Sequence, residues 1–526
     1  MSRAGKVLVV SLLLLLAALA VRVGYVKHTP FQAVNDAGTY NRLASMMART
    51  GDYDTGSAPD SGAGGSRGPT AYFPPGYPYS LAAVDLLTGH QAGGKTAVPA
   101  ERIGQAVLGT ITVGLIGLVA LEAFGAPTAL VAIALAAFYP VLIEQTGTLV
   151  AENLLLVFEL LAVWTALRAR RAPRPYGWIA ATGMLTGAAT LTHQNAILLV
   201  IPLAFAAAAA AARPGPNRTR PRLRALAAPT LLIIITGATI APWTIRNAIE
   251  LHHLVPVADE TGITLVGTYN PVSAAARPVP YKWRLFSKLP EDLQLKRTAG
   301  RYTEVAFGDK LRAQALHYIG QHPLSPLAVA GHNTLRLFEL EGAYAWQASA
   351  QAVGLHVAVA RTGVIAFWIM SLLALAGAFT AAARTSPRWI WAIPVLLGLS
   401  VVFVNVETPR FREPIEPFLI LLASCAVVAL LRRARLGSDA LGSAPGARLL
   451  GLGRAPVRCV GGAARVAGAH GQLVQMIQRL PRPHRHAGQR RLRPRDGHAG
   501  LERDELVEAA DQGAAAGEQD AVAGDV

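Results

Sequence analysis

Residues 6–26 read KVLVVSLLLLLAALAVRVGYV, a stretch whose charged residues are Lys6 and Arg22. A helix needs about 20 mostly apolar residues to cross the roughly 30 Å hydrocarbon layer of a bilayer. Because lipid offers backbone N–H and C=O groups no partners, a crossing segment satisfies them within itself, as a helix. Nine more such stretches follow, so the sequence predicts an all-α polytopic membrane protein with about ten or more transmembrane helices. The predicted spans cover residues 6–26, 102–122, 126–144, 149–167, 176–192, 195–212, 225–243, 356–382, 389–405 and 413–431.

The composition supports this class and excludes others. Of the 526 residues, 52% are hydrophobic and 15% are charged, whereas soluble domains carry about 25% charged residues. The net charge of +17 is spread over short clusters between apolar runs, which does not suit a nucleic-acid-binding protein. Cys425 and Cys459 have no second cysteine or histidine nearby at metal-ligand spacing, and the HExxH and CxxC motifs are absent. A disulfide framework and a zinc module are therefore excluded.

Positive charge between the spans predicts their orientation, because lysine and arginine gather in short cytoplasmic loops. Arginine clusters lie at 168–174, 213–224, 384–388 and 432–435, whereas the outer hairpins around Gly147 and His193 contain no lysine or arginine. In the last outer loop Arg410 and Arg412 break the rule. With the N-terminus inside, two long segments, about 27–101 and 244–355, lie on the outer face. A cleavable signal peptide is the alternative for the first stretch, and the residues after it lie outside in both cases.

The outer segments carry helical patterns. The first predicts a juxtamembrane surface helix from Asn35, a glycine- and serine-rich loop over 56–68 and a proline-rich turn. The second predicts a small mixed outer domain with helices near 291–320 and 325–340. These segments and the spans form one predicted domain, residues 1–431.

The composition changes after the last span. Residues 436–526 are rich in alanine, glycine and arginine and nearly free of aromatic residues, so they cannot bury a core. Residues 432–526 are therefore predicted to be a disordered cytoplasmic low-complexity tail. So abrupt a change also fits a frameshifted reading of the coding sequence.

Polar side chains stand at the outer ends of several predicted helices. Asp36 follows the first span closely, where its carboxylate can take a proton from a hydroxyl or amine that arrives from outside; it equally suits an N-cap. Glu152 and Asn153 open the fourth span, where the acid either caps the helix or faces a polar cavity. His193 lies in a short outer hairpin, either as a hydrogen-bonded loop residue or as a ligand for an anionic head group.

Three arginines lie at the outer ends of spans. Arg246 ends the seventh span, and Arg410 and Arg412 precede the last one. A guanidinium at the boundary of lipid and water is well suited to phosphate. The alternative for Arg410 and Arg412 is pairing with Glu407 and Glu413. Arginines that hold a phosphate opposite an acid would suit transfer from a lipid-linked phosphate, and transfer of a sugar would need positive charge at the leaving phosphate.

The order of these motifs resembles the C-type superfamily of membrane glycosyltransferases. Within it, the sequence is most similar to the bacterial branch of family 39, related to protein O-mannosyltransferases and lipid A aminoarabinose transferases. The resemblance covers about residues 1–431. It rests on Asn35-Asp36-Ala37-Gly38-Thr39-Tyr40, Tyr72-Phe73-Pro74-Pro75-Gly76-Tyr77-Pro78, Glu152-Asn153, Pro242-Trp243 through Arg246-Asn247, and Pro409-Arg410-Phe411-Arg412-Glu413-Pro414.

The resemblance implies a multi-pass enzyme of the cell membrane with its active site on the extracytoplasmic side. Such an enzyme moves a hexose or pentose from a polyprenyl phosphate to an envelope glycan, lipid or protein. Asp36 would be the general base, and Arg246, Arg410 and Arg412 would contact the donor phosphate. The residues lining the cavity would be Tyr77, Glu152, Asn153, His193 and Asn247.

The sequence departs from the family near the proline turn. Relatives often have a further acid there, whereas the nearest candidate here is Asp60, across a glycine-rich tract. A divalent cation is therefore unsupported, and no cofactor is assigned. The alternative function is a transporter or flippase of lipid-linked sugars. Transporters commonly place charges near the midplane, and here the charges lie at the outer rim, which favours the enzyme.

Overall fold

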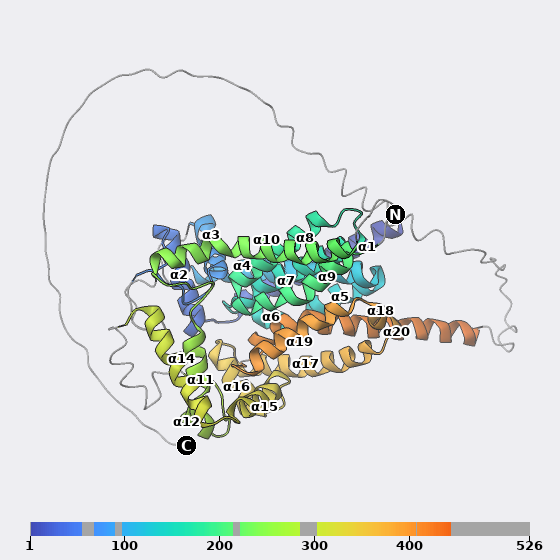
Figure 1. The fold of residues 1–526 in the computed structure, drawn as a ribbon. Coiled ribbons are helices and arrows are strands. Elements are labelled where there is room, and N and C mark those ends of the chain that lie inside the picture. The colour runs from blue at the N-terminus through green and yellow to red at the C-terminus, as the bar shows by residue number, and fades with distance from the viewer. Residues whose placement is uncertain are drawn as a thin grey trace, which may run out of the picture. The chain divides into compact units, whose positions relative to one another are not determined.

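The computed structural model describes residues 2–54, 68–89, 97–213, 221–284, 302–406 and 408–442. Within these ranges every regular element is a helix, and the β-contact is an isolated bridge between Asp54 and Pro69. The short helices α2 (Asn35–Thr50), α11 (Thr261–Thr268) and α14 (Glu304–Gln321) gather at one end of the long helices (Figure 1). The predicted all-α class is confirmed. The outer domain predicted to be mixed is helical in its described part, because its apolar residues recur at helical spacing.

In the described ranges six helices are long and apolar enough to cross a membrane. A seventh crossing is available if α5 (Ala126–Phe138) and α6 (Pro140–Thr146), which meet at a bend of 54°, form one broken span. The chain is thus a multi-pass membrane protein. The six are α1 (Arg3–His28), α4 (Val98–Phe124), η1 (Gln194–Leu199) with α9 (Val200–Ala211), α10 (Pro221–Glu250), α17 (Val357–Ala378), and η5 (Arg410–Ile415) with α20 (Glu416–Gly442).

The other predicted spans are helices that fall short of a full apolar crossing. Helix α7 (Glu152–Arg171) carries Glu159 within it, α8 (Tyr176–Thr192) has 17 residues, and α19 (Arg388–Val402) has 15. The count of ten spans therefore stays a prediction. Helix α20 continues to Gly442, past the boundary expected at residue 431, and the predicted tail lies outside the described residues from 443 onward.

The bend between α5 and α6 is held by Arg22 of α1. Pro140 has no N–H to donate to the carbonyl of Ala136, so a helix cannot run through it unbroken. The buried Arg22 guanidinium donates instead to the carbonyls of Ala136 (3.1 Å) and Ala137 (3.0 Å). A charged group inside the membrane part of the bundle thus satisfies the backbone that the proline leaves open.

Helix α7 connects the two ends of the bundle. Its 20 residues extend about 30 Å at 1.5 Å per residue. At its C-terminal end Arg171 pairs with Glu122 (2.9 Å), beside the arginine-rich loop predicted to be cytoplasmic. Glu152 opens the helix at the opposite end, which is where the candidate site lies.

Candidate functional site

Asp36 lies in the first turn of α2. The N-cap position is taken by Val34, which makes no side-chain cap, so Asp36 does not cap the helix. Its carboxylate Oδ2 lies 2.5 Å from Nη1 of Arg410, and its side chain is 41% exposed. Asp36 is therefore a carboxylate that is both held by an arginine and accessible.

Arg410 joins Asp36 to the start of α7. Its Nε donates to Oε1 of Glu152 at 2.7 Å, and the side chains of Arg410 and Glu152 are 9% and 1% exposed. Glu152 is the first residue of α7 and makes no cap, so it faces a polar cluster, one of its two predicted roles. The guanidinium of Arg410 thus binds two carboxyl groups, one of which, Asp36, lies 374 residues away in the sequence.

Two further polar groups complete this cluster. Nε2 of His193 lies 3.8 Å from Oε1 of Glu152, and Nε2 of Gln194 donates to Glu260 at 2.9 Å. Burial lowers the pKa of His193. Burial, together with Asp36 and Glu152 nearby, raises the pKa of Glu260 to about 8. At pH 7 both groups are therefore mainly uncharged.

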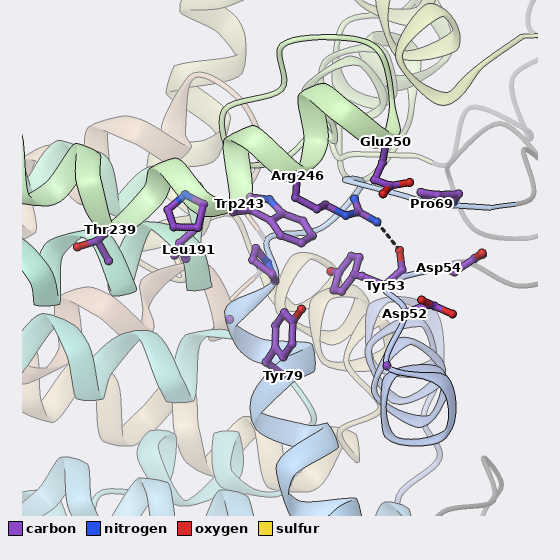
Figure 2. Close-up of a pocket in the computed structure, with 14 residues that line it drawn as sticks. Asp52, Tyr53, Asp54, Pro69, Tyr79, Leu191, Thr239, Trp243, Arg246 and Glu250 are labelled. Atoms are coloured by element: carbon purple, nitrogen blue, oxygen red, sulfur yellow. Dashed lines mark hydrogen bonds between the residues drawn. The ribbon is translucent and has the colours of Figure 1, made fainter. Parts of the chain in front are cut away.

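A cavity of about 740 Å³ lies beside Arg246. Figure 2 shows the Arg246 side chain between Trp243 and Tyr53, with Tyr79 and Glu250 on the walls. The wall begins where α3 (Gly76–Thr88) packs against the end of α8. A Cβ on Gly76 would lie 2.7 Å from Oγ1 of Thr192 and 2.9 Å from the carbonyl of Leu191, so only glycine permits this contact.

Arg246 is held by neutral groups. It donates to the carbonyls of Thr70 (2.7 Å) and Tyr53 (2.8 Å), and its guanidinium carbon lies 4.9 Å from the ring centroid of Trp243. No carboxylate in the described ranges forms an ion pair with it. Its charge is therefore available to an anion in the cavity, while the backbone contacts fix its position.

Arg412 points away from this cavity. Its side chain is 2% exposed and pairs with Glu416 (2.6 Å) and Glu339 (2.9 Å). It also donates to the carbonyl of Leu337 at 3.0 Å, and its guanidinium carbon lies 3.6 Å from the ring centroid of Phe367. Neither Arg410 nor Arg412 pairs with Glu413 within the described part of the chain, and Glu407 lies outside it.

The remaining predicted cavity residues are buried in structural hydrogen bonds. Tyr77 accepts from Gln105 at 2.7 Å and packs edge-on against Tyr40. Asn153 donates to the carbonyl of Gln145 at 2.9 Å, and Asn247 donates to that of Val255 at 3.0 Å. These three residues support the walls behind the cluster and the cavity.

Sequence reasoning missed Glu260, Tyr53 and Tyr79. Glu260 stands at the N-cap position of α11 without a side-chain cap, and it reaches the cluster because the chain folds back after α10. Tyr79 directly follows the proline turn, in a stretch whose aromatic residues pointed to it, whereas Tyr53 lies before the glycine-rich tract and had no such signal. In the described residues no group of three or more His, Cys, Asp or Glu side chains is arranged to hold a metal ion.

Residues 89–96, GHQAGGKT, fit the nucleotide-binding pattern GxxxxGK[ST]. A P-loop follows a β-strand and opens a helix. This stretch instead follows helix α3, and residues 90–96 lie outside the described ranges. The pattern alone therefore does not indicate a nucleotide site.

Comparisons with known proteins agree with the fold. Residues 73–243 match the model of the dolichyl-phosphate-mannose-protein mannosyltransferase family. The oligosaccharyltransferase AglB from Archaeoglobus fulgidus, solved with an inhibitory peptide and a dolichol-phosphate, is 13% identical with a TM-score of 0.50. The match covers 91% of this chain and 55% of AglB, so the chain spans about half its length. ArnT from Cupriavidus metallidurans is 16% identical with a TM-score of 0.34, over 83% of this chain and 80% of ArnT.

No curated protein sequence matches the chain significantly. The family match is confined to residues 73–243, and the likeness to AglB concerns the fold.

Proposed function

We propose that the chain transfers a sugar from a polyprenyl phosphate to an acceptor on the outer face of the cell membrane. The observation that carries the proposal is Asp36, 41% exposed and held 2.5 Å from Arg410. An accessible carboxylate fixed beside a guanidinium supplies a proton acceptor next to a site for a leaving phosphate. The acceptor classes are an envelope glycan, lipid or protein. AglB was solved with a dolichol-phosphate and an inhibitory peptide. The mannosyltransferase family that residues 73–243 match supports a transferase over a transporter.

The proposed reaction is a single displacement with inversion. The acceptor oxygen bonds to the anomeric carbon of the sugar as the bond from that carbon to the phosphate oxygen breaks. The electron pair leaves with the polyprenyl phosphate, and the acceptor proton passes to Asp36. Arg410 stands beside the reacting atoms, where the phosphate competes with Asp36 for its guanidinium. Donor binding would then free the carboxylate to act as the base.

Arg246 is proposed to hold the donor head group in the cavity. The positive charge has no ion-pair partner in the described residues, and α10 exposes Ile245 (58%) and Ile249 (63%) close by. A polyprenyl chain can therefore lie along apolar helix surface while its phosphate meets the guanidinium. Arg412, paired with two buried carboxyl groups, is proposed to position η5 and not to bind phosphate.

The test compares wild type with Asp36→Asn in membranes supplied with radiolabelled polyprenyl-phosphate hexoses and pentoses. Asparagine keeps an oxygen for Arg410 but accepts no proton, so transfer should fall about 10²- to 10⁴-fold. Donor binding should be retained or tightened, because a neutral amide competes less with the phosphate for Arg410. Asp309→Asn is the matched control, because Asp309 is also an exposed outer acid (53%) and should leave transfer intact. Retained turnover in Asp36→Asn would show that Asp36 is not the general base, and would contradict the proposed mechanism.

A further inference from the structure

The outward side of helix α15 (Ser325–Leu337) is apolar. Leu327, Leu335 and the C-cap residue Phe338 are 66%, 43% and 49% exposed. With the exposed residues Gly331 and Thr334, they fall at positions i, i+4, i+7, i+8 and i+11, a single stripe on the helix. The hydroxyl of Thr334 donates to the carbonyl of Ala330 at 2.7 Å. The stripe therefore carries no charge, and its hydroxyl is satisfied within the helix.

The inward side of α15 carries polar side chains beside the apolar Val329 and Leu337. Asn333 is 0% exposed and donates to the carbonyl of Val402 at 2.9 Å. Arg336 is 2% exposed, pairs with Glu341 and donates to Oδ1 of Asn333 at 2.9 Å. A surface helix in water turns its polar side outward and its apolar side to the core. Helix α15 instead buries its arginine and asparagine together with Val329 and Leu337, and it turns an uncharged, mainly apolar stripe outward, as a helix in a hydrocarbon solvent does.

Helix α14, directly before α15, shows the ordinary arrangement. Its buried side carries Phe307 and Leu311, while Asp309 and Arg312 are 53% and 49% exposed. Both helices belong to the segment that the sequence places on the outer face. Their outward sides therefore differ: α14 exposes an ion pair, whereas the stripe on α15 carries no charge.

The contacts of α15 place it beside transmembrane helices. It meets the end of α19, whose 15 residues extend about 22 Å and so stop short of the roughly 30 Å hydrocarbon layer. At the other end of α15, the Phe338 carbonyl accepts from Nε1 of Trp368 at 3.1 Å. Trp368 lies eleven residues into the 22-residue helix α17, about 16 Å along its axis. These contacts place α15 alongside α19 and the middle of α17.

The stripe continues onto the exposed face of α17. On that face Trp368, Ile369 and Leu372 are 43%, 57% and 68% exposed, as expected for a span that faces lipid. We propose that α15 lies in the acyl-chain layer, in the half of the bilayer that holds Asp36 and Arg410, with its outward stripe against lipid tails. This inference concerns membrane contact and does not depend on sugar transfer.

The test uses spin labels on single cysteines of the full chain in liposomes, with Cys425 and Cys459 replaced by alanine. Leu327→Cys and Leu335→Cys report on α15. Lys310→Cys on α14 is the control for water, and Leu372→Cys on α17 is the control for lipid. Collision with oxygen, which concentrates in hydrocarbon, is compared with collision with a water-soluble nickel chelate.

We expect the α15 labels to match Leu372→Cys, with high oxygen and low nickel accessibility, and Lys310→Cys to show the reverse. Nickel accessibility like that of Lys310→Cys would place α15 in water and overturn the proposal. Low accessibility to both reagents would show that protein covers the stripe, and would overturn it as well. Dipolar coupling between labels would then identify a second copy of the chain as the cover.

Discussion

Replacing Arg412 with methionine tests whether this arginine is structural. The side chain is 2% exposed and its two partners, Glu339 and Glu416, are 3% and 0% exposed. Removing one partner of a buried ion pair costs about 3–5 kcal/mol, because the remaining charge stays buried. The carbonyl of Leu337 also loses a donor, which adds about 1 kcal/mol. Methionine still packs on the Phe367 ring, so no large cavity forms, and we expect a total loss of roughly 4–6 kcal/mol.

The assay is unfolding of the detergent-solubilised full chain, followed by tryptophan fluorescence. The matched control is Arg312→Met, which breaks the pair with Asp309 on the surface of α14, where both side chains are about half exposed. A pair of that kind contributes about 0–1 kcal/mol. A triple variant that also carries Glu339→Gln and Glu416→Gln should regain most of the lost stability, because no buried charge is then left without a partner.

An opposite pattern would refute this reasoning. If the free energy of unfolding of Arg412→Met lies within about 1 kcal/mol of the wild-type value and the variant binds the donor more weakly, Arg412 is a phosphate ligand. If the triple variant is no more stable than Arg412→Met, the loss has another origin than the two carboxyl groups.

Two further predictions concern the cavity and the cluster. Arg246→Met should raise the Kd of a polyprenyl phosphate about 10- to 100-fold, because a charge-assisted hydrogen bond is lost; unchanged binding in a vesicle assay would place the phosphate elsewhere. The raised pKa of Glu260, about 8, means that the folded state holds a proton that the unfolded state releases above its ordinary value of 4.5. The contribution of Glu260 to the free energy of unfolding therefore falls as the pH rises from 4.5 to 8. Glu260→Gln should have a higher melting temperature than wild type at pH 8.5 and the same melting temperature at pH 5. Parallel melting curves across this range would contradict the assignment.

Much of the helical framework could be predicted from the sequence, because hydropathy over about 20 residues is a local property. The first of the arginine clusters that predicted the orientation lies at the end of α7 opposite Glu152. The partners of each charge could not be predicted in this way. Arg410 and Arg412 are two positions apart on a 3₁₀ turn, where successive residues are rotated by about 120°. They therefore face different sides, one toward Asp36 and the other toward Glu416.

The start of α2 shows a second limit. Asn35-Asp36 reads as a capping signal, because short polar side chains often close the first turn of a helix. In the fold Asn35 has a φ of 52° and donates to the carbonyl of Ala352, 317 residues away, while Asp36 turns to Arg410. Tertiary partners outweighed the local cap, and no pattern within the α2 segment indicates them.

The polarity of α15 connects the membrane to the proposed site. Arg336 is buried because it binds Glu341 and backbone carbonyls near residue 280. The composition of α15 alone therefore does not predict whether Arg336 faces water or protein. The end of α15 is in turn tied to η5, because the Leu337 carbonyl accepts from Arg412. On the other side of the same short helix, Arg410 holds Asp36. A helix lying in lipid is thus joined through one buried arginine to the turn that positions the proposed base, so a disturbance of α15 should reach Asp36 through Arg412.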